Sequence, residues 1–289
     1  MFVSNQRTFA GKWLICIFSY NRAAYLQNLL ESITRFYPDF DVAVFDDMSE
    51  DSATGKLLAA LKQKGTRVIT GDADTTKSKH GGLYTQMNEA LNYAIEQGFD
   101  YAYFVQDDMQ FLWRDETLEI RVKEVFGYNE CVMCNCNFLQ KILKAGIEER
   151  LPWVKECAFS FKGNGVADTG IINLQKAKYI GLHFPCHSES GNGRYWHDRN
   201  YRLYWLPQPH LAWVPWPTTY RNKSKESRNP RFLNPLSADA INKLAGNNSY
   251  VYLEDYTSIQ GWAIKPYWYT ANPGFLNLLK IYFKYYLAI

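Results

Sequence analysis

The sequence predicts an α/β protein built on a mostly parallel, Rossmann-like sheet flanked by helices. In the first hundred residues, short apolar runs alternate with segments of helical spacing. Strands that alternate with helices of this length are joined by right-handed crossovers, which make the strands parallel. We therefore expect one central sheet, with an irregular extension towards the C-terminus.

Four apolar runs predict the strands of this sheet. Each run is short, is rich in β-branched or aromatic residues and lacks helical spacing. The predicted strands are residues 13–19, 41–45, 67–70 and 101–105.

The segments between these runs carry the apolar spacing of amphipathic helices. Residues 23–36 place three leucines and an isoleucine on one face. Gly65 and Gly98 end the second and third helical segments, as glycine commonly does. The predicted helices are residues 23–36, 53–64 and 81–97.

The second half of the chain is less regular. From residue 183 to 231 it is rich in Pro, Gly, His, Trp and Arg with little periodicity, which is typical of functional or mobile segments. Because no linker interrupts the chain, we predict one continuous domain over residues 1–270. The elements predicted in this half are helices at 115–126 and 174–180 and strands at 131–138 and 171–173.

The amino-acid composition excludes few classes of function. A formal net charge of +3 with mixed signs gives no reason to expect a nucleic-acid partner. The aromatic content of 16% suits stacking on sugars or bases, an ordinary core or a membrane-facing surface. Cys131, Cys134 and Cys136 lack a second pair at zinc-site spacing, so we predict a strand with buried thiols and a reducing, cytoplasmic setting.

The last residues, 271–289, form an apolar and aromatic tail. Asn277, Lys280 and Lys284 interrupt it from Pro273 onwards. An interfacial membrane anchor and a helix packed on the domain or in an oligomer contact fit this pattern equally well. We expect no signal peptide and no transmembrane segment.

The strand predicted at 101–105 ends in Gln106-Asp107-Asp108-Met109. Adjacent carboxylates at the end of a buried strand repel each other and lose hydration, which is costly unless a cation or a hydrogen-bond network compensates. Ligands bind at such strand ends. The pair therefore indicates a divalent cation holding a phosphorylated ligand, and a solvated acidic turn is the alternative.

Polar clusters follow three of the predicted parallel strands, so they should converge at one edge of the sheet. They are residues 19–22, 46–51 and 106–108. A carboxylate of the second cluster suits a base N–H or a ribose hydroxyl. Lys79, Gly81 and Gly82 precede a helix, where a lysine and the helix N-terminus favour an anion.

These motifs resemble those of family-2-type glycosyltransferases of the GT-A fold. Residues 15–22, Ile-Cys-Ile-Phe-Ser-Tyr-Asn-Arg, are similar to the opening of that family. Val44-Phe-Asp-Asp-Met-Ser-Glu-Asp51 is similar to its double-Asp turn, with Met48 in place of Gly. Gln106-Asp107-Asp108 resembles its metal motif, with Gln106 in place of the first acid. The resemblance covers roughly residues 13 to 112, is loose to about residue 220 and is absent beyond.

The resemblance implies a nucleotide-binding half over residues 1–112 and an acceptor half over 113–270. Asp108 would bind the divalent cation, Mn or Mg, that bridges the diphosphate of a nucleotide-sugar. Asp107 would contact ribose or the donor sugar. The residues that would hold the nucleoside are Ser19, Asn21, Arg22, Asp46 and Asp47.

Inverting members of this family use a carboxylate base near the acceptor hydroxyl. The family places it about 15 to 20 residues before a Tyr-x-x-Pro strand, which Tyr204-Trp-Leu-Pro207 resembles. Glu189 lies at the matching distance and is the first candidate, followed by Asp198 and then Asp168. A loop carboxylate paired with a nearby arginine is the alternative for each.

Other residues are candidates for metal or sugar contacts. GT-A proteins often take a metal ligand from a histidine after this strand, which makes His210 a candidate, although a structural histidine is the alternative. Residues 163–170 resemble the family's acceptor-side loop. Tryptophans suit either stacking on acceptor sugars or core packing, and residues 221–228 suit either a basic loop over the diphosphate or a solvated surface. The tryptophans are Trp153, Trp196, Trp213 and Trp216.

Together these expectations describe a metal-assisted, inverting glycosyltransferase. It would move a sugar from a nucleotide-sugar to a hydroxyl of a glycan or lipid-linked acceptor in surface polysaccharide or lipopolysaccharide biosynthesis, in the cytoplasm or at the inner membrane face. One alternative is a sugar-nucleotide nucleotidyltransferase, which would need a Gly-rich loop with Arg after the first strand. A non-catalytic carbohydrate-binding protein is the other, and it leaves the acidic strand ends unexplained.

Overall fold

The computed structural model describes residues 9–71, 82–137, 147–151, 158–161, 167–206 and 210–214 of the 289-residue chain. Its strands are β1 (Trp13–Ser19), β2 (Asp41–Asp46), β3 (Arg67–Thr70), β4 (Tyr101–Gln106), β5 (Met109–Phe111), β6 (Cys131–Asn135), β7 (Ile147–Leu151), β8 (Ala158–Phe161), β9 (Gly170–Asn173), β10 (Arg202–Trp205) and β11 (Leu211–Trp213). Its helices are α1 (Ala23–Phe36), α2 (Ser52–Gln63), α3 (Leu83–Glu96), α4 (Leu118–Phe126), α5 (Leu174–Ile180) and α6 (Glu189–His197).

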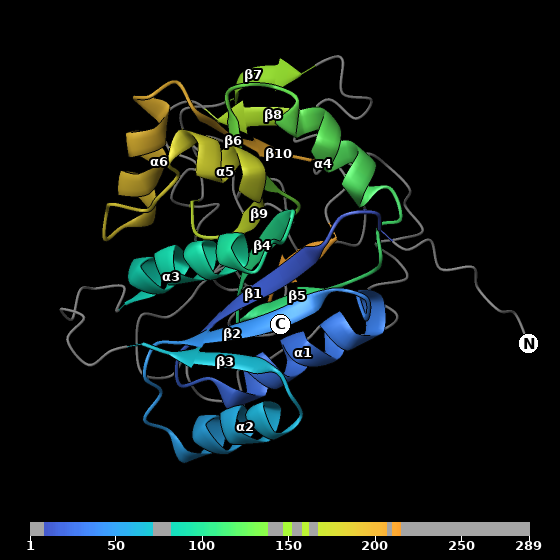
Figure 1. Cartoon of the computed structure of the whole chain (residues 1–289), viewed down its shortest axis with the longest axis vertical. Coiled ribbons are helices and arrows are strands. Elements are labelled where there is room, and N and C mark those ends of the chain that lie inside the picture. The colour runs from blue at the N-terminus through green and yellow to red at the C-terminus, as the bar shows by residue number, and fades with distance from the viewer. Residues whose placement is uncertain are drawn as a thin grey trace, which may run out of the picture.

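A nine-stranded sheet in the order β3-β2-β1-β4-β9-β6-β10-β8-β7 forms the centre of the protein (Figure 1). Strands β3, β2, β1 and β4 are parallel neighbours, and β6 and β10 are also parallel. Only β9 and β8 run against the other strands of this sheet. The predicted α/β class, with a mostly parallel sheet flanked by helices, is confirmed.

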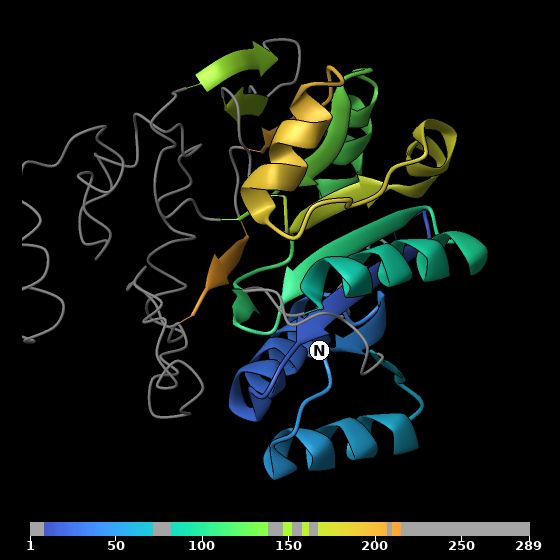
Figure 2. The same ribbon diagram turned by 90° about the vertical axis from the view of Figure 1, so that its left-hand side faces the viewer.

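Both faces of the sheet are covered, because β1 sends alternate side chains to opposite sides. Leu14, Cys16 and Phe18 pack in one apolar cluster with residues of α3, α5 and α6. Trp13, Ile15 and Ile17 belong to the other cluster, with residues of α1, α2 and α4. Figure 2 shows α3 lying along β4 and β1, so the polar ends of these strands are held on a rigid frame.

The helices and strands of residues 13–106 lie where the sequence predicted them, within one or two residues at their ends. Strand β1, strand β3 and helix α1 match their predicted ranges. Helix α2 begins one residue early because the Asp51 carboxylate caps it, accepting hydrogen bonds from the N–H groups of Ala53 and Thr54.

The differences between the predicted and the observed helices and strands lie mainly in the second half of the chain. The helix predicted from 115 begins at Leu118, because the Asp115 carboxylate accepts hydrogen bonds from the N–H and hydroxyl of Thr117 and holds a turn there. The strand predicted to residue 138 ends at Asn135, after which the Cys136 carbonyl accepts from the N–H of His210. In the stretch from 183 that lacked periodicity, the described residues form α6, β10 and β11.

Strand β9 enters the sheet between β4 and β6, and Gly170 makes this possible. Its φ of +138° lies in a region that L side chains rarely adopt. A Cβ added there would come within 2.7 Å of Met133 Cγ and 3.1 Å of Asn135 Oδ1. The backbone of β9 can therefore approach β6 only with glycine at this position.

The cysteines of β6 behave as the sequence predicted. Cys131 and Cys134 lie in the strand and Cys136 follows it, all three fully buried and free of disulfides. Burial raises the pKa of the Cys131 thiol to about 12, so it stays protonated and acts as a small apolar group. In the ranges given above, none of the helices combines the length and the apolar character needed to cross a bilayer.

Candidate active site at the carboxyl edge of the sheet

The three polar clusters lie side by side at one edge of the sheet. In the strand register, Ser19 pairs with Asp46, and Phe18 pairs with Gln106. The carbonyls of Ser19 and Phe18 accept hydrogen bonds from the N–H groups of Asp47 and Asp107, at 2.9 and 3.0 Å. The predicted convergence of these strand ends is confirmed.

The carboxylate of Asp46 shapes the turn after β2. Its Oδ2 accepts a 2.7 Å hydrogen bond from the N–H of Ser49, and its Oδ1 accepts a 2.6 Å bond from the Ser49 hydroxyl. Only 1% of Asp46 is exposed. Both carboxylate oxygens are thus engaged within the turn, although the sequence assigned Asp46 to the nucleoside.

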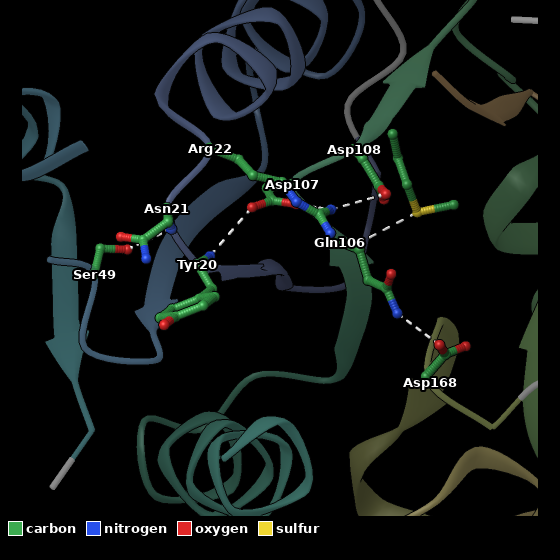
Figure 3. Close-up of polar contacts among 9 residues, drawn as sticks. Tyr20, Asn21, Arg22, Ser49, Gln106, Asp107, Asp108 and Asp168 are labelled. Carbon is green, nitrogen blue, oxygen red and sulfur yellow. Dashed lines mark hydrogen bonds and ion pairs between the residues drawn. The ribbon is translucent and has the colours of Figure 1, made fainter. Parts of the chain in front are cut away.

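Asn21 joins the loop after β1 to this turn (Figure 3). Its backbone N–H donates to the Ser49 hydroxyl at 2.8 Å, and its side-chain oxygen accepts from the N–H groups of Glu50 and Asp51. The φ of Asn21 is +52°, a left-handed conformation that asparagine tolerates better than most residues. Asn21 therefore fixes the relative position of two polar clusters.

Asp47 is the more accessible acid of the double-Asp turn. Its Oδ2 accepts a 2.8 Å hydrogen bond from the N–H of Gly82, at the start of α3. Partial burial raises the pKa of Asp47, an effect that the Gly82 hydrogen bond opposes and the nearby Asp46 reinforces. The N-terminus of α3, which was predicted to bind an anion, thus binds the Asp47 carboxylate. Lys79 and Gly81 lie outside the described residues.

Ser19 is the last residue of β1 and is 4% exposed. Its hydroxyl has no hydrogen-bond partner within the described part of the chain. A buried hydroxyl without a partner is costly, and a ligand that supplied one would recover that cost. This agrees with the expectation that Ser19 contacts the nucleoside.

Arg22 bridges the two acids at the end of β4 (Figure 3). Its Nη1 lies 3.0 Å from Oδ1 of Asp107 and 2.9 Å from Oδ2 of Asp108. The acids are 3% and 4% exposed. The nearby Asp107 raises the pKa of Arg22, burial opposes this, and Asp108 adds to the rise. The cation that the buried acids require is therefore a residue of the chain, one that the sequence assigned to the nucleoside.

Asp107 and Asp108 nevertheless carry suitable chemistry for a divalent cation. Magnesium is commonly held by one or two carboxylates together with substrate phosphates. Within the described ranges, no group of three or more His, Cys, Asp or Glu side chains is arranged to hold a metal. The acid pair thus fits a cation whose remaining ligands come from a bound diphosphate and water.

Gln106, which stands where the family motif has an acid, connects β4 to Asp168, two residues before β9. Its Nε2 donates a 2.6 Å hydrogen bond to Oδ2 of Asp168 (Figure 3). An acid at position 106 would instead repel Asp168. Sequence reasoning missed this contact, because Gln106 and Asp168 are 62 residues apart.

Tyr84 of α3 lies near two of the three base candidates. Burial raises its pKa, and the negative charges of Asp168 and Glu189 raise it further. Both carboxyl groups therefore act on the same buried phenol. Helix α6, whose first turn holds Glu189, and the segment before β9 come together next to α3.

Asp198 lies elsewhere. It is the C-cap of α6 and its side chain is 65% exposed. Nine residues separate it from Glu189, which is about 13 Å along a helix. The structure thus brings Glu189 and Asp168 to one region and leaves Asp198 at the opposite end of α6.

His210 is not brought to the acid pair. It is fully buried, its ring stacks on Phe111 at 5.9 Å between centroids, and its Nε2 lies 3.3 Å from the Tyr103 hydroxyl. Burial, with Arg121, lowers its pKa to about 3. In the β11–β5 ladder Asp108 lies at the other end from His210, about four residues or 13 Å away. The expectation that His210 joins Asp108 therefore finds no support in this geometry.

Sequence reasoning also missed a buried network of polar side chains next to Asp168 in the chain, formed by Asn135, Asn137 and Thr169. The Asn137 amide donates to the Thr169 hydroxyl at 2.8 Å and to Asn135 Oδ1 at 3.2 Å. All three residues are 2% exposed or less. The two asparagines in the apolar run 131–137 were the available signal, since buried amides occur mainly where a network satisfies them.

The remaining candidates either pack in or near the core or lie outside the described residues. Trp196 is 2% exposed and donates to the His183 carbonyl, as a core residue does. Trp213 is partly buried in β11. Trp153, Trp216, residues 163–166 and residues 221–228 lie outside the described residues.

The mostly parallel sheet, with acids at the carboxyl ends of β2 and β4, agrees with the arrangement expected from the resemblance to glycosyltransferases of the GT-A fold. Residues 14–138 match the family model described as "Glycosyl transferase family 2". The match places this segment among glycosyltransferase sequences, which is the enzyme class that the sequence predicted. A search of the curated proteins finds no match to the chain.

Solved structures of low similarity include several glycosyltransferases. One titled "Crystal structure of S. aureus TarS" is 16% identical, with a TM-score of 0.48, over 82% of this chain and 42% of that chain. A fragment titled "S. aureus TarS 1-349 in complex with UDP-GlcNAc" has the same identity and TM-score, over 88% of this chain and 76% of the fragment. "Mannosyltransferase PcManGT from Pyrobaculum calidifontis in complex with GDP-Man and Mn2+" is 15% identical, with a TM-score of 0.45, over 71% of this chain and 57% of that chain. The chain thus spans less than half of the first TarS structure, and this degree of likeness carries no functional assignment.

Proposed function

We propose that this protein transfers a sugar from a nucleotide-sugar donor to a hydroxyl group of a glycan or lipid-linked acceptor, with inversion at the anomeric carbon. The observation that carries the proposal is the convergence of three polar strand ends around the buried pair Asp107 and Asp108. The family match over residues 14–138 supports the same reaction class.

In this proposal the donor lies across the carboxyl ends of β1, β2 and β4. Asp47 and Ser19 contact the nucleoside, since Asp47 is the more accessible acid of its turn and the Ser19 hydroxyl has no partner within the described ranges. Asn21 and Asp46 hold the two loops in place. A Mn or Mg ion held by Asp108, with Asp107 beside it, would supply positive charge to the leaving diphosphate.

The carboxylate of Glu189 takes the proton of the acceptor hydroxyl, and Asp168 is the alternative base. As the proton moves to the carboxylate, the hydroxyl oxygen bonds to the anomeric carbon of the donor sugar. The bond from that carbon to the diphosphate oxygen breaks, and the nucleoside diphosphate leaves with the electron pair. Gln106 orients Asp168 through its 2.6 Å hydrogen bond.

The acceptor half, the pathway and the membrane contact belong to the proposal as well. We assign residues 1–112 to the donor and 113–270 to the acceptor, which we place in surface polysaccharide or lipopolysaccharide biosynthesis. The apolar tail 271–289 would hold the enzyme at the inner face of a membrane next to a lipid-linked acceptor.

Two other functions remain as alternatives. A nucleotidyltransferase would need a glycine-rich loop with Arg after β1, whereas this loop is Tyr20-Asn21-Arg22 and its arginine pairs with the acids of β4. A sugar-binding protein without catalysis does not require two adjacent buried carboxylates at this edge of the sheet, and burying such charges is costly even when they pair with Arg22. Neither alternative accounts for the acid edge.

Calorimetric titration with UDP, GDP, CDP and dTDP, each with and without Mn²⁺, tests the proposal. We expect one nucleotide to bind, and Mn²⁺ to strengthen its binding. In the variant Asp108→Asn this strengthening should be lost and sugar transfer should fall to background, because the carboxylate that would hold the cation is gone. Absence of binding to any of the four nucleotides would refute the transferase function.

A further inference from the structure

In the ion pair of Arg22 with Asp107 and Asp108, one nitrogen serves two acids. Nη1 of Arg22 lies 3.0 Å from Asp107 and 2.9 Å from Asp108. These are the distances of strong, charge-assisted hydrogen bonds. A point between the two carboxylates, where a divalent cation would bind, is therefore the point that the guanidinium nitrogen takes.

The backbone around Arg22 holds it in this position. Arg22 is the N-cap residue of α1, and its carbonyl accepts a 3.0 Å hydrogen bond from the N–H of Leu26. Its side chain makes no capping hydrogen bond to the helix and extends to the end of β4. The start of α1 thus holds the backbone of Arg22 in place, and the acids at the end of β4 hold its guanidinium.

Within the described ranges, Arg22 is a cation that the structure places directly against this acid pair. With Gln106 in place of an acid, the motif at the end of β4 carries two carboxylates rather than three. Arg22 neutralises one of these charges, and burial makes loss of that compensation expensive. A divalent cation competes with the Arg22 guanidinium for the same carboxylate oxygens, and the two positive groups repel each other when they are this close.

We propose that Arg22 is the resident cation of this acid pair, and that a divalent metal binds Asp107 and Asp108 only by displacing its guanidinium. This rests on the proposed function insofar as the acid pair is taken as the cation site. The Arg22 side chain is 24% exposed, so it has a route away from the acids. A bound diphosphate would receive the displaced guanidinium, since Arg pairs well with phosphate.

The consequence is that donor and metal bind together. Without a nucleotide, the metal must break an ion pair and leave Arg22 without an anionic partner. With a nucleotide diphosphate, Arg22 changes partners and the metal gains phosphate ligands. We therefore expect nucleotide and metal to increase each other's affinity by about 10-fold or more, within the range of typical coupling between sites.

Titration of Mn²⁺ into the full chain without nucleotide, followed by calorimetry, tests the inference. Arg22→Gln should bind Mn²⁺ about 10-fold more tightly than the wild type, since the competitor is removed. Arg114→Gln is the matched control, because Arg114 also pairs with two acids, Asp39 and Glu116. It should bind Mn²⁺ like the wild type. Equal or weaker binding by Arg22→Gln would overturn the inference.

Removal of Arg22 takes its positive charge away from two buried acids, so this variant risks unfolding. A measurement on the wild type covers that outcome. The Arg22 Nε–Hε resonance, followed by NMR during titration with diamagnetic Mg²⁺, should shift with the same midpoint as Mg²⁺ binding. A resonance that stays unchanged while Mg²⁺ binds would overturn the inference. Neither measurement uses nucleotide or sugar transfer, so both stand apart from the nucleotide titrations that test the function.

Discussion

At the scale of single residues, the structure separates acids that look equivalent in the sequence. Asp46 and Asp47 are neighbours, yet Asp46 binds Ser49 within its own turn and Asp47 reaches the start of α3. The sequence predicted that acids would collect at this edge, since strand ends of a parallel sheet converge. It could not predict which oxygens are engaged, because that depends on contacts such as Arg22 to Asp107, which are 85 residues apart.

The turn that follows β2 contains a residue in a strained backbone conformation. Met48 stands where the family motif has Gly, and its φ is +56°. A non-glycine residue in this region costs on the order of 1 kcal/mol or more. The hydrogen bonds of Asp46 to Ser49 and of Asn21 to Glu50 offset that cost by holding the turn.

His210 gives a prediction on pH and stability. Its pKa is about 3 in the fold and about 6.5 in an unfolded chain, so the unfolded state binds the extra proton between these values. Stability therefore falls as the pH drops through 6.5 and levels off below 3. From pH 7 to pH 4.5 the free energy of unfolding should decrease by about 2–3 kcal/mol from this residue. Urea unfolding at both pH values measures it.

His210→Phe is the test variant, since Phe retains the stacking on Phe111 and does not titrate. It should lose less stability on acidification than the wild type. If His210→Phe and the wild type lose stability equally, another group causes the acid sensitivity.

At the scale of elements, helix α6 shows where sequence reasoning stopped. Its sequence, Glu-Ser-Gly-Asn-Gly-Arg-Tyr-Trp-His, contains two glycines and few apolar residues, so it carries little helical periodicity. Side-chain hydrogen bonds at its N-terminal end stabilise it instead. The Ser188 hydroxyl caps it by accepting from the N–H of Gly191, and the buried Asn192 amide donates to the Cys186 carbonyl. By contrast, α1 is strongly amphipathic, and the sequence predicted both of its ends.

Helix α6 also determines which carboxylate acts as base in the proposed reaction. Glu189→Gln should lower kcat by about 10²- to 10⁴-fold, the usual contribution of a general base, while the Kd for the nucleotide changes little. Asp198→Asn is the matched control at the other end of the helix and should keep wild-type turnover. Steady-state kinetics and nucleotide titration together give both quantities.

Wild-type turnover in Glu189→Gln would exclude this residue as the base. The same measurements on Asp168→Asn would then assign the role. Because Asp168 accepts a hydrogen bond from Gln106, the variant Gln106→Leu should change the pH profile of kcat if Asp168 is the base.

At the scale of the whole molecule, the sequence predicted the parallel half of the sheet but not how the second half joins it. Periodicity identifies strands, and crossover handedness makes them parallel. Strands β9 and β8, which run against the others, are short and connect residues far apart in the chain. Nothing local in the sequence specifies such pairing, because it depends on the complete sheet.

The tail 271–289 gives a prediction for the whole chain, made from its sequence. Truncation before Pro273 should remove binding to anionic phospholipid vesicles, measured by co-sedimentation, if the tail is an interfacial anchor. The full chain with Lys280→Glu and Lys284→Glu should bind such vesicles more weakly, because the attraction of lysine to anionic lipid is lost. Unchanged sedimentation of the truncated chain would refute the anchor.

The entry of β9 between β4 and β6 has a consequence for dissection of the protein. Residues 1–112 end before β9, so this fragment alone would leave the apolar edge of β4 without its neighbour. Open edges of this kind promote aggregation. We therefore expect the two halves to depend on each other for folding. Mixing them as separate polypeptides would amount to fragment complementation, in which β9 of one piece restores the neighbour of β4 in the other.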